Sequence, residues 1–129
     1  MIILDTSAII RYLTVDDKTK AEKVKIFLET EKEIVIVDVV LPEIEYALSK
    51  FYKATRVDLI KTFNFLASLR NILLTREAKT AIQIFEKTKL DMADCIIAAY
   101  SFKGSLASFD SELLDIEGVS PFWKNRFSK

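Results

Sequence analysis

Short apolar runs alternate along the chain with longer segments in which apolar residues recur every three or four positions. The longer segments have the periodicity of amphipathic helices and cover residues 8–13, 21–28, 42–52, 57–69, 77–87 and 91–102. The short runs are typical of buried parallel strands and lie at residues 2–4, 34–37, 72–74 and 105–109. The alternation predicts an α/β fold with a mainly parallel central sheet of four to five short strands flanked by helices. The last of these strands is expected within residues 118–129.

The composition favours one compact unit. Half of the 129 residues are apolar, and the chain contains only two Gly and two Pro. A chain of this length buries roughly two-thirds of its surface on folding, which is enough for one hydrophobic core. Since no internal repeat or linker is visible, we expect a single domain over residues 1–129.

The charged residues balance, with 19 Lys and Arg against 19 Asp and Glu. A net charge of zero creates no global field, so any contact with nucleic acid must come from a local patch. Cys95 is the only cysteine and cannot form an internal disulfide, which favours a reducing cytoplasm. We see no export signal or membrane-spanning run. The absence of histidine excludes Ser/His/Asp and Cys/His triads, so carboxylates are expected to carry any catalysis.

Four acidic residues fall at the ends of predicted strands or the starts of predicted helices. Asp5 and Asp110 each close a strand, whereas Glu43 and Asp94 lie in first helical turns. Ligands of parallel sheets bind outside the carboxyl ends of the strands, so these acids could share one crevice. Clustered carboxylates stay ionised when hard cations such as Mg2+ or Mn2+ lie between them. Two ions about 4 Å apart can activate water and stabilise the leaving oxygen of a phosphodiester without histidine.

The first two acids also have structural explanations. Asp5 is a favoured residue type for the N-cap of the following helix. Glu43 could be a first-turn acid that the helix dipole stabilises. The periodicity does not separate it from Glu45, which flanks the other edge of the same apolar stripe.

The remaining acids leave similar alternatives open. Asp91 and Asp94 are three positions apart, like an N-cap and its N3 partner, so capping explains either residue and is the preferred account of Asp91. Asp110 precedes Ser111 and could belong to a turn or a cap. Asp38, which follows the second strand, is expected to be structural.

Four short segments resemble, in order, the motifs of the PIN-domain ribonucleases, and especially those of the small VapC-type toxins. They are residues 3–7 (Ile-Leu-Asp-Thr-Ser), 40–44 (Val-Leu-Pro-Glu-Ile), 90–99 (Leu-Asp-Met-Ala-Asp-Cys-Ile-Ile-Ala-Ala) and 108–110 (Ser-Phe-Asp). The third is the most specific, because acids at a helix start with Ile-Ile-Ala-Ala behind them are uncommon. The resemblance extends over the whole chain and implies a PIN-like three-layer fold.

The resemblance also implies a site. It selects Glu43 over Glu45 and Asp94 over Asp91, so that the metal-ligating catalytic acids would be Asp5, Glu43, Asp94 and Asp110. The supporting residues would be Thr6, Ser7, Ser108 and Asp91. Asp91 would either cap the helix or support the metal ligands without binding the metal itself.

The activity implied by the resemblance is hydrolysis of single-stranded or looped RNA with Mg2+ or Mn2+. The partners would be an RNA substrate, a second copy in a homodimer, and a cognate antitoxin that blocks the acids. One alternative is a PIN-fold module that binds metal and RNA with little or no nuclease activity. A phospho-accepting regulatory domain is a second alternative, but no strand-end Lys supports it.

Several other residues are candidates for contacts with RNA or protein. Arg11, just past Asp5, is a candidate RNA contact. Basic residues later in the chain could bind phosphate or form a solvated helix face, and these are Lys50, Lys53 and Arg56. An apolar group could form a dimer or antitoxin surface, or pack in the core, and it comprises Phe63, Phe65, Leu66 and Leu69.

Overall fold

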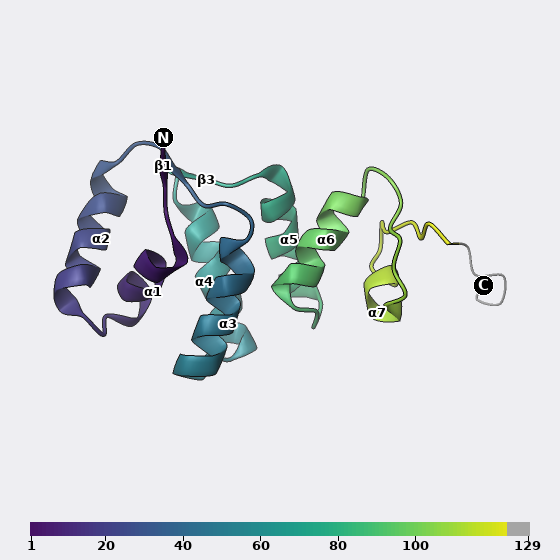
Figure 1. Cartoon of the computed structure of the whole chain (residues 1–129), viewed down its shortest axis with the longest axis horizontal. Helices are drawn as coiled ribbons and strands as arrows, with labels where there is room; N and C mark the ends of the chain where they lie inside the picture. The colour runs from purple at the N-terminus through teal and green to yellow at the C-terminus, as the bar shows by residue number, and fades with distance from the viewer. Residues whose placement is uncertain (124–129) are drawn as a thin grey trace.

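The structure is a computed structural model that describes residues 1–123 (Figure 1). Its elements, in chain order, are β1 (Ile2–Ile3), α1 (Thr6–Thr14), α2 (Lys18–Thr30), β2 (Ile34–Val35), α3 (Val40–Tyr52), α4 (Arg56–Ser68), β3 (Ile72–Leu73), α5 (Arg76–Lys87), α6 (Met92–Ser101) and α7 (Ser111–Leu114). Each predicted helix is present, although several begin one to three residues from the predicted start. None of the helices in this part of the chain is long and apolar enough to cross a membrane.

The sheet is small and parallel. Its strand order is β1-β2-β3, with Ile2 opposite Ile34 and Ile34 opposite Ile72. The Leu4 amide donates to the Val35 carbonyl oxygen at 2.8 Å, so the ladder continues to the residue before Asp5. The predicted α/β class with a parallel sheet flanked by helices is therefore confirmed.

The segment predicted as a strand at residues 105–109 does not join this sheet. Leu106 instead forms an isolated bridge with Pro121, and its carbonyl oxygen accepts from the Phe122 amide at 2.8 Å. A side-chain contact joins the same two segments, since the Phe109 and Trp123 rings stack with their centroids 4.8 Å apart. The chain after α6 thus pairs with its own continuation, which leaves three strands in the sheet of the described residues. Positions 124–129 of the predicted last strand lie outside the described residues.

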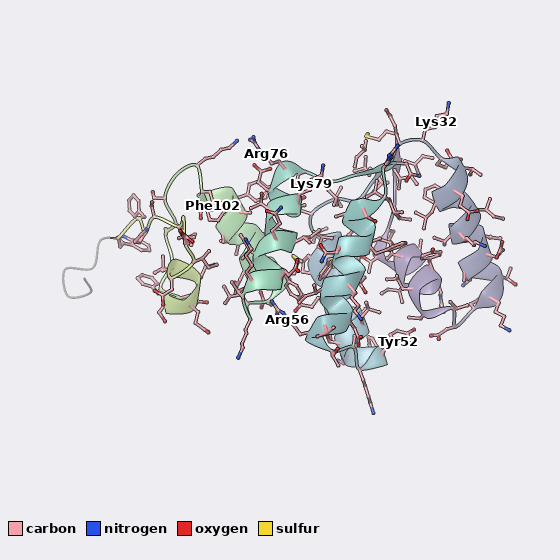
Figure 2. All side chains as sticks on the ribbon, turned by 180° about the vertical axis from the view of Figure 1, so that it is seen from behind. Lys32, Tyr52, Arg56, Arg76, Lys79 and Phe102 are labelled. Atoms are coloured by element: carbon pink, nitrogen blue, oxygen red, sulfur yellow. The ribbon has the colours of Figure 1, made fainter. Side chains whose placement is uncertain are left out.

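A glycine holds this C-terminal segment against the end of α6. Gly118 has a φ of +99°, and a Cβ atom there would lie 3.2 Å from Cε1 of Phe102. Phe102, labelled in Figure 2, therefore packs on a backbone that only glycine fits comfortably.

The core explains most of the apolar residues in the predicted helices. Phe63 and Phe85 are fully buried and meet edge to face at 5.2 Å. Leu66 is also buried and Leu69 packs against the core, so core packing is the correct interpretation of these residues and of Phe63. Phe65 is partly exposed at the surface of α4.

Two helices next to the first strand end in an unusual way. Val15 follows α1 and Lys53 follows α3, and both have left-handed backbone conformations with φ of 56° and 55°. The Tyr52 hydroxyl donates to Asp16 at 2.5 Å. The C-terminal ends of α1 and α3 are therefore tied to each other.

Candidate functional site

Asp5 and Glu43 line one open cleft of about 450 Å3 between α1 and α3. Leu4 is buried at the end of the β1 ladder, which fixes the position of Asp5 directly after it. Ile44 is fully buried in the core, so its neighbour Glu43 lies at the surface of the first turn of α3. Strand and helix thus bring together two acids that are far apart in the sequence.

Asp5 caps α1 and faces the cleft at the same time. Its Oδ2 accepts from the Ser7 amide at 3.2 Å and from the Ser7 hydroxyl at 2.7 Å. These hydrogen bonds hold the pKa of the Asp5 carboxyl below its usual value of 3.8, so the group is anionic at neutral pH. The capping interpretation and the cleft position are therefore compatible.

Hydroxyl groups contact both acids of this cleft. The Thr6 hydroxyl donates to Oε1 of Glu43, which connects the start of α1 to the start of α3. Ser7 contacts Asp5 as described, and Arg11 lines the same cleft one turn further along α1. Of the two predicted supporting hydroxyls, Ser7 thus contacts Asp5, whereas Thr6 contacts Glu43.

A second group of acids lies near the starts of α6 and α7. Asp94 is in the first turn of α6 and is partly buried. Burial raises the pKa of the Asp94 carboxyl, and the charges of Asp91 and Asp110 raise it further. Asp94 and Asp110 are therefore electrostatic neighbours, but neither lines the cleft that holds Asp5 and Glu43.

Asp91 and Asp110 are both helix caps. The Asp94 amide donates to Oδ1 of Asp91 at 2.9 Å, which is the cap geometry preferred for Asp91. Oδ1 of Asp110 accepts from the amides of Glu112 and Leu113 at the start of α7. The Asp110 amide in turn donates to the Ser108 hydroxyl at 3.0 Å, so Ser108 fixes the backbone of this acid.

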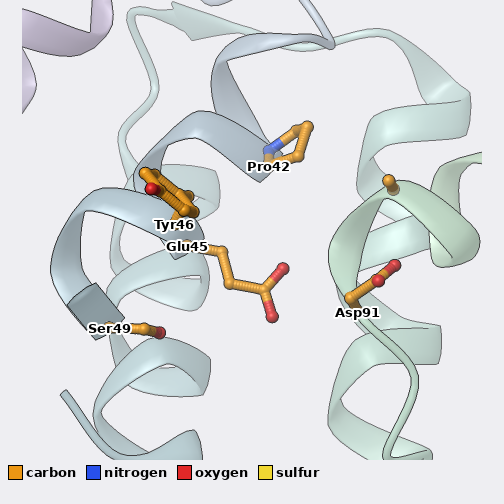
Figure 3. Close-up of a pocket in the computed structure, with 6 residues that line it drawn as sticks. Pro42, Glu45, Tyr46, Ser49 and Asp91 are labelled. Carbon is orange, nitrogen blue, oxygen red and sulfur yellow. The ribbon is translucent and has the colours of Figure 1, made fainter. Parts of the chain in front are cut away.

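Glu45 belongs to this second group, although the family motif selects Glu43. Its carboxylate accepts from the Met92 amide at 2.8 Å and lines a cleft of about 330 Å3 with Asp91. Figure 3 shows the Glu45 side chain extending from α3 toward Asp91. Burial raises the pKa of Glu45, while the Met92 hydrogen bond opposes the rise. No local sequence pattern indicates this contact, because it depends on the packing of α3 against α6.

Helix α3 presents Glu43 and Glu45 on different sides. Residues two positions apart on a helix point roughly 200° apart, so Glu43 and Glu45 face opposite sides of α3. Figure 1 shows α3 between α1 and α6. Over residues 1–123, no three His, Cys, Asp or Glu side chains are grouped so that they could hold one metal ion. Proteins usually bind Mg2+ through one or two carboxylates together with water and phosphate oxygens, and Asp5 and Glu43 are the two carboxylates that line this cleft.

Arg56, one of the basic candidates, has a structural role. Its guanidinium donates to the carbonyl oxygens of Phe85 at 2.7 Å and Thr88 at 3.0 Å. It also lies 3.5 Å from the centroid of the Phe85 ring (Figure 2). Arg56 thus joins the start of α4 to the end of α5. Its guanidinium makes its contacts with residues of the protein itself.

Asp38 is structural, as the sequence indicates. It follows β2 and accepts hydrogen bonds from the hydroxyls of Thr75 and Tyr100. These contacts connect the ends of β2 and β3 to α6. The hydrogen bond to Asp38 raises the pKa of the Tyr100 hydroxyl above 10.0.

The fold and the cleft define a small α/β domain in which an acid after the first strand of a parallel sheet and an acid in the first turn of α3 line one cleft. The sequence model of the PIN domain family matches residues 2–119, and the chain belongs to this family. No curated protein and no solved structure gives a significant match. PIN domains are generally nucleases, so the fold is of a nuclease type and nucleic acid is the class of ligand that it implies.

Proposed function

We propose that this protein is a metal-dependent endoribonuclease that hydrolyses RNA phosphodiesters. The observation that carries the proposal is the pairing of Asp5 with Glu43 in one open cleft of a PIN domain. In this proposal the two carboxylates hold Mg2+ or Mn2+, and Asp94 and Asp110 complete the acidic set around the substrate. Oxygen ligands of this kind are those that hard divalent cations prefer.

The residues of the cleft have distinct roles in the proposed reaction. A bound divalent ion supplies charge that stabilises the developing negative charge of the phosphodiester. Asp5 remains anionic at neutral pH because Ser7 hydrogen bonds favour its charged form. Thr6 holds the Glu43 carboxylate in place, and Arg11 is positioned to contact a substrate phosphate. Each role predicts a different loss on substitution.

The biological role that we propose is that of a toxin in a VapBC-type pair, acting in the cytoplasm as a homodimer. The family motifs at residues 3–7, 40–44, 90–99 and 108–110 support this assignment. A cognate antitoxin would cover the acidic cleft and silence it. Growth arrest on expression of the protein, relieved by the product of an adjacent small gene, tests the assignment. Expression without any effect on growth or cellular RNA would count against it.

One observation favours a second function, an RNA- and metal-binding module with little or no cleavage. Asp94 and Asp110 do not line the cleft of Asp5 and Glu43. A centre with two carboxylates could bind an ion and an RNA phosphate without completing hydrolysis. Metal binding by titration calorimetry, combined with intact RNA after long incubation, would select this alternative.

The decisive experiment compares cleavage by four purified proteins in Mg2+, Mn2+ and EDTA. We expect Asp5→Asn and Glu43→Gln to lose activity by about 100-fold or more, since loss of a supporting residue alone costs 10–100-fold in metal sites. Glu29→Gln, an exposed acid on α2, is the matched control and should cleave like the wild type. Equal cleavage by all four proteins, or cleavage that persists in EDTA, would overturn the proposal.

A further inference from the structure

A basic cleft adjoins the acidic one. It has a volume of about 370 Å3, lies between α1 and α2, and is lined by Ser7, Ala8, Arg11, Lys20, Lys23 and Val24. None of these six residues is acidic. Ser7 and Arg11 line both clefts, so the basic and acidic clefts form one continuous surface.

Exposed aromatic residues border the acidic cleft on its opposite side. Phe51 lines that cleft and is 68% exposed, and its ring meets the 58% exposed ring of Tyr46 edge to face at 6.4 Å. The Lys50 ammonium lies 5.7 Å from the Phe51 ring centroid and donates to the Tyr46 hydroxyl at 2.7 Å. Large apolar rings in water next to a cation are the features on which unpaired bases stack.

We propose that a single strand of RNA crosses the acidic cleft, with its phosphates on Arg11, Lys20 and Lys23 and an unpaired base on Phe51. This inference rests on the proposed function, because it makes Asp5 and Glu43 the middle of the track. The lysines and the arginine supply sequence-independent affinity for phosphate. Phe51 makes the surface select single strands, because a paired base in a duplex does not expose its face for stacking.

Helix α2 offers a matched control for the basic cleft. Lys20 and Lys23 lie on the side of the helix that lines the cleft. Lys18 and Lys25 occupy the same helix but point roughly half a turn away from that pair. Replacing either pair with alanine removes the same charge from the same exposed helix, so a difference between the two variants reports the position of the charges.

Binding is measured with metal-free protein carrying Asp5→Asn, so that no RNA is cut. Asparagine also caps helices well, so this parent protein should fold normally. Fluorescence anisotropy with a short single-stranded RNA and with a hairpin duplex gives affinities at several salt concentrations. Circular dichroism melts verify that each variant is folded.

We expect the double substitution Lys20→Ala and Lys23→Ala to weaken single-strand binding by about tenfold. It should also reduce the salt slope, which is the slope of the logarithm of the binding constant against the logarithm of the salt concentration, by about 1.4, because two phosphate contacts of about 0.7 each are lost. Lys18→Ala with Lys25→Ala should leave the slope unchanged. Phe51→Ala should also cost about tenfold for the single strand, with little change for the duplex, and Phe51→Trp should restore the affinity.

Several results would overturn this inference. They are an equal effect of the two lysine pairs, an unchanged affinity in Phe51→Ala, tighter binding of the duplex, and no binding by the parent protein. The proposed function fails separately, because it requires metal-dependent cleavage by the wild type. Absent cleavage together with the expected binding losses would leave the RNA surface in place and reject the nuclease.

Discussion

Asp5 shows why a single acid at a strand end is difficult to interpret from sequence. It accepts the hydrogen bonds that begin α1, and it also faces the cleft that contains Glu43. A cap and a candidate metal ligand need the same residue type at the same place, since both use a carboxylate oxygen beside a helix N-terminus. The two roles can be separated only by substitutions that keep one of them.

The first prediction concerns this separation. Asp5→Asn retains a cap acceptor, so its urea midpoint should stay close to that of the wild type, whereas Asp5→Ala should lower the midpoint because the cap is lost. Both variants should lose RNA cleavage by about 100-fold or more. Urea unfolding and a cleavage assay on the same preparations check this. Retained cleavage in the asparagine variant would assign Asp5 to capping alone.

The second prediction uses the raised pKa of Tyr100. Its hydroxyl donates to Asp38 only while protonated, and its pKa in the folded protein lies above the ordinary value of 10.0. The hydrogen bond therefore stabilises the fold below pH 10, and this contribution is lost as the pH rises through the raised pKa. Tyr100→Phe should be less stable than the wild type at pH 8, and the difference should shrink above pH 10. Urea midpoints measured across this range test it, and a difference independent of pH would refute it.

At the scale of elements, α3 organises the site. Its first turns send Glu43 toward α1 and Glu45 toward α6, so one helix contributes an acid to each of two clefts. The sequence predicts that α3 exists and that an acid lies in its first turn. It cannot predict the side that each acid faces, because this follows from the packing of α1 and α6 on either side of the helix.

The same distinction holds for the other elements. Helices were predictable from their periodicity and caps, which are local properties of the chain. The segment at residues 105–109 was not, because a strand requires a partner, and Leu106 pairs with Pro121 rather than with the sheet. The four acids lie near strand ends and helix starts as expected, but which of them share a cleft depends on how α1, α3 and α6 pack together.

The third prediction concerns the contact between α4 and α5. Arg56→Ala removes two charged hydrogen bonds and a contact with the Phe85 ring, and should destabilise the protein by about 2 kcal/mol. Arg56→Lys should recover less than half of this loss, because an ammonium cannot replace the planar fork. Exposed Lys61 on the same helix is the control, with less than about 0.5 kcal/mol expected for Lys61→Ala. A lysine variant as stable as the wild type would contradict this account.

At the scale of the whole molecule, the C-terminal segment contributes little to the core, since Leu113 is the only buried residue among residues 103–123. Phe109 is 88% exposed although it stacks on Trp123, and its contacts are made mainly within the segment itself. By contrast, the helices from α1 to α6 pack around one continuous cluster of buried residues. Segments with few buried contacts open more easily than the core.

The fourth prediction follows from this difference, because Trp123 is the only tryptophan. Its fluorescence should report a lower urea midpoint than circular dichroism at 222 nm, which follows the helices. Phe109→Ala should change the Trp123 emission while altering the global stability by less than about 0.5 kcal/mol. Coincident midpoints for the two signals would show that the segment unfolds together with the core.

The order of the strands has a practical consequence for handling the protein. In the part of the chain described, β1 pairs with β2 and has no strand on its other side, and Ile3 on it is 53% exposed. Natural sheets protect such an edge with lysine, proline, a bulge or a very short edge strand, and β1, which has only two residues, has the last of these protections. Lengthening β1 would therefore remove the feature that limits pairing through this edge. An affinity tag is better placed at the C-terminus, where it cannot lengthen the exposed strand.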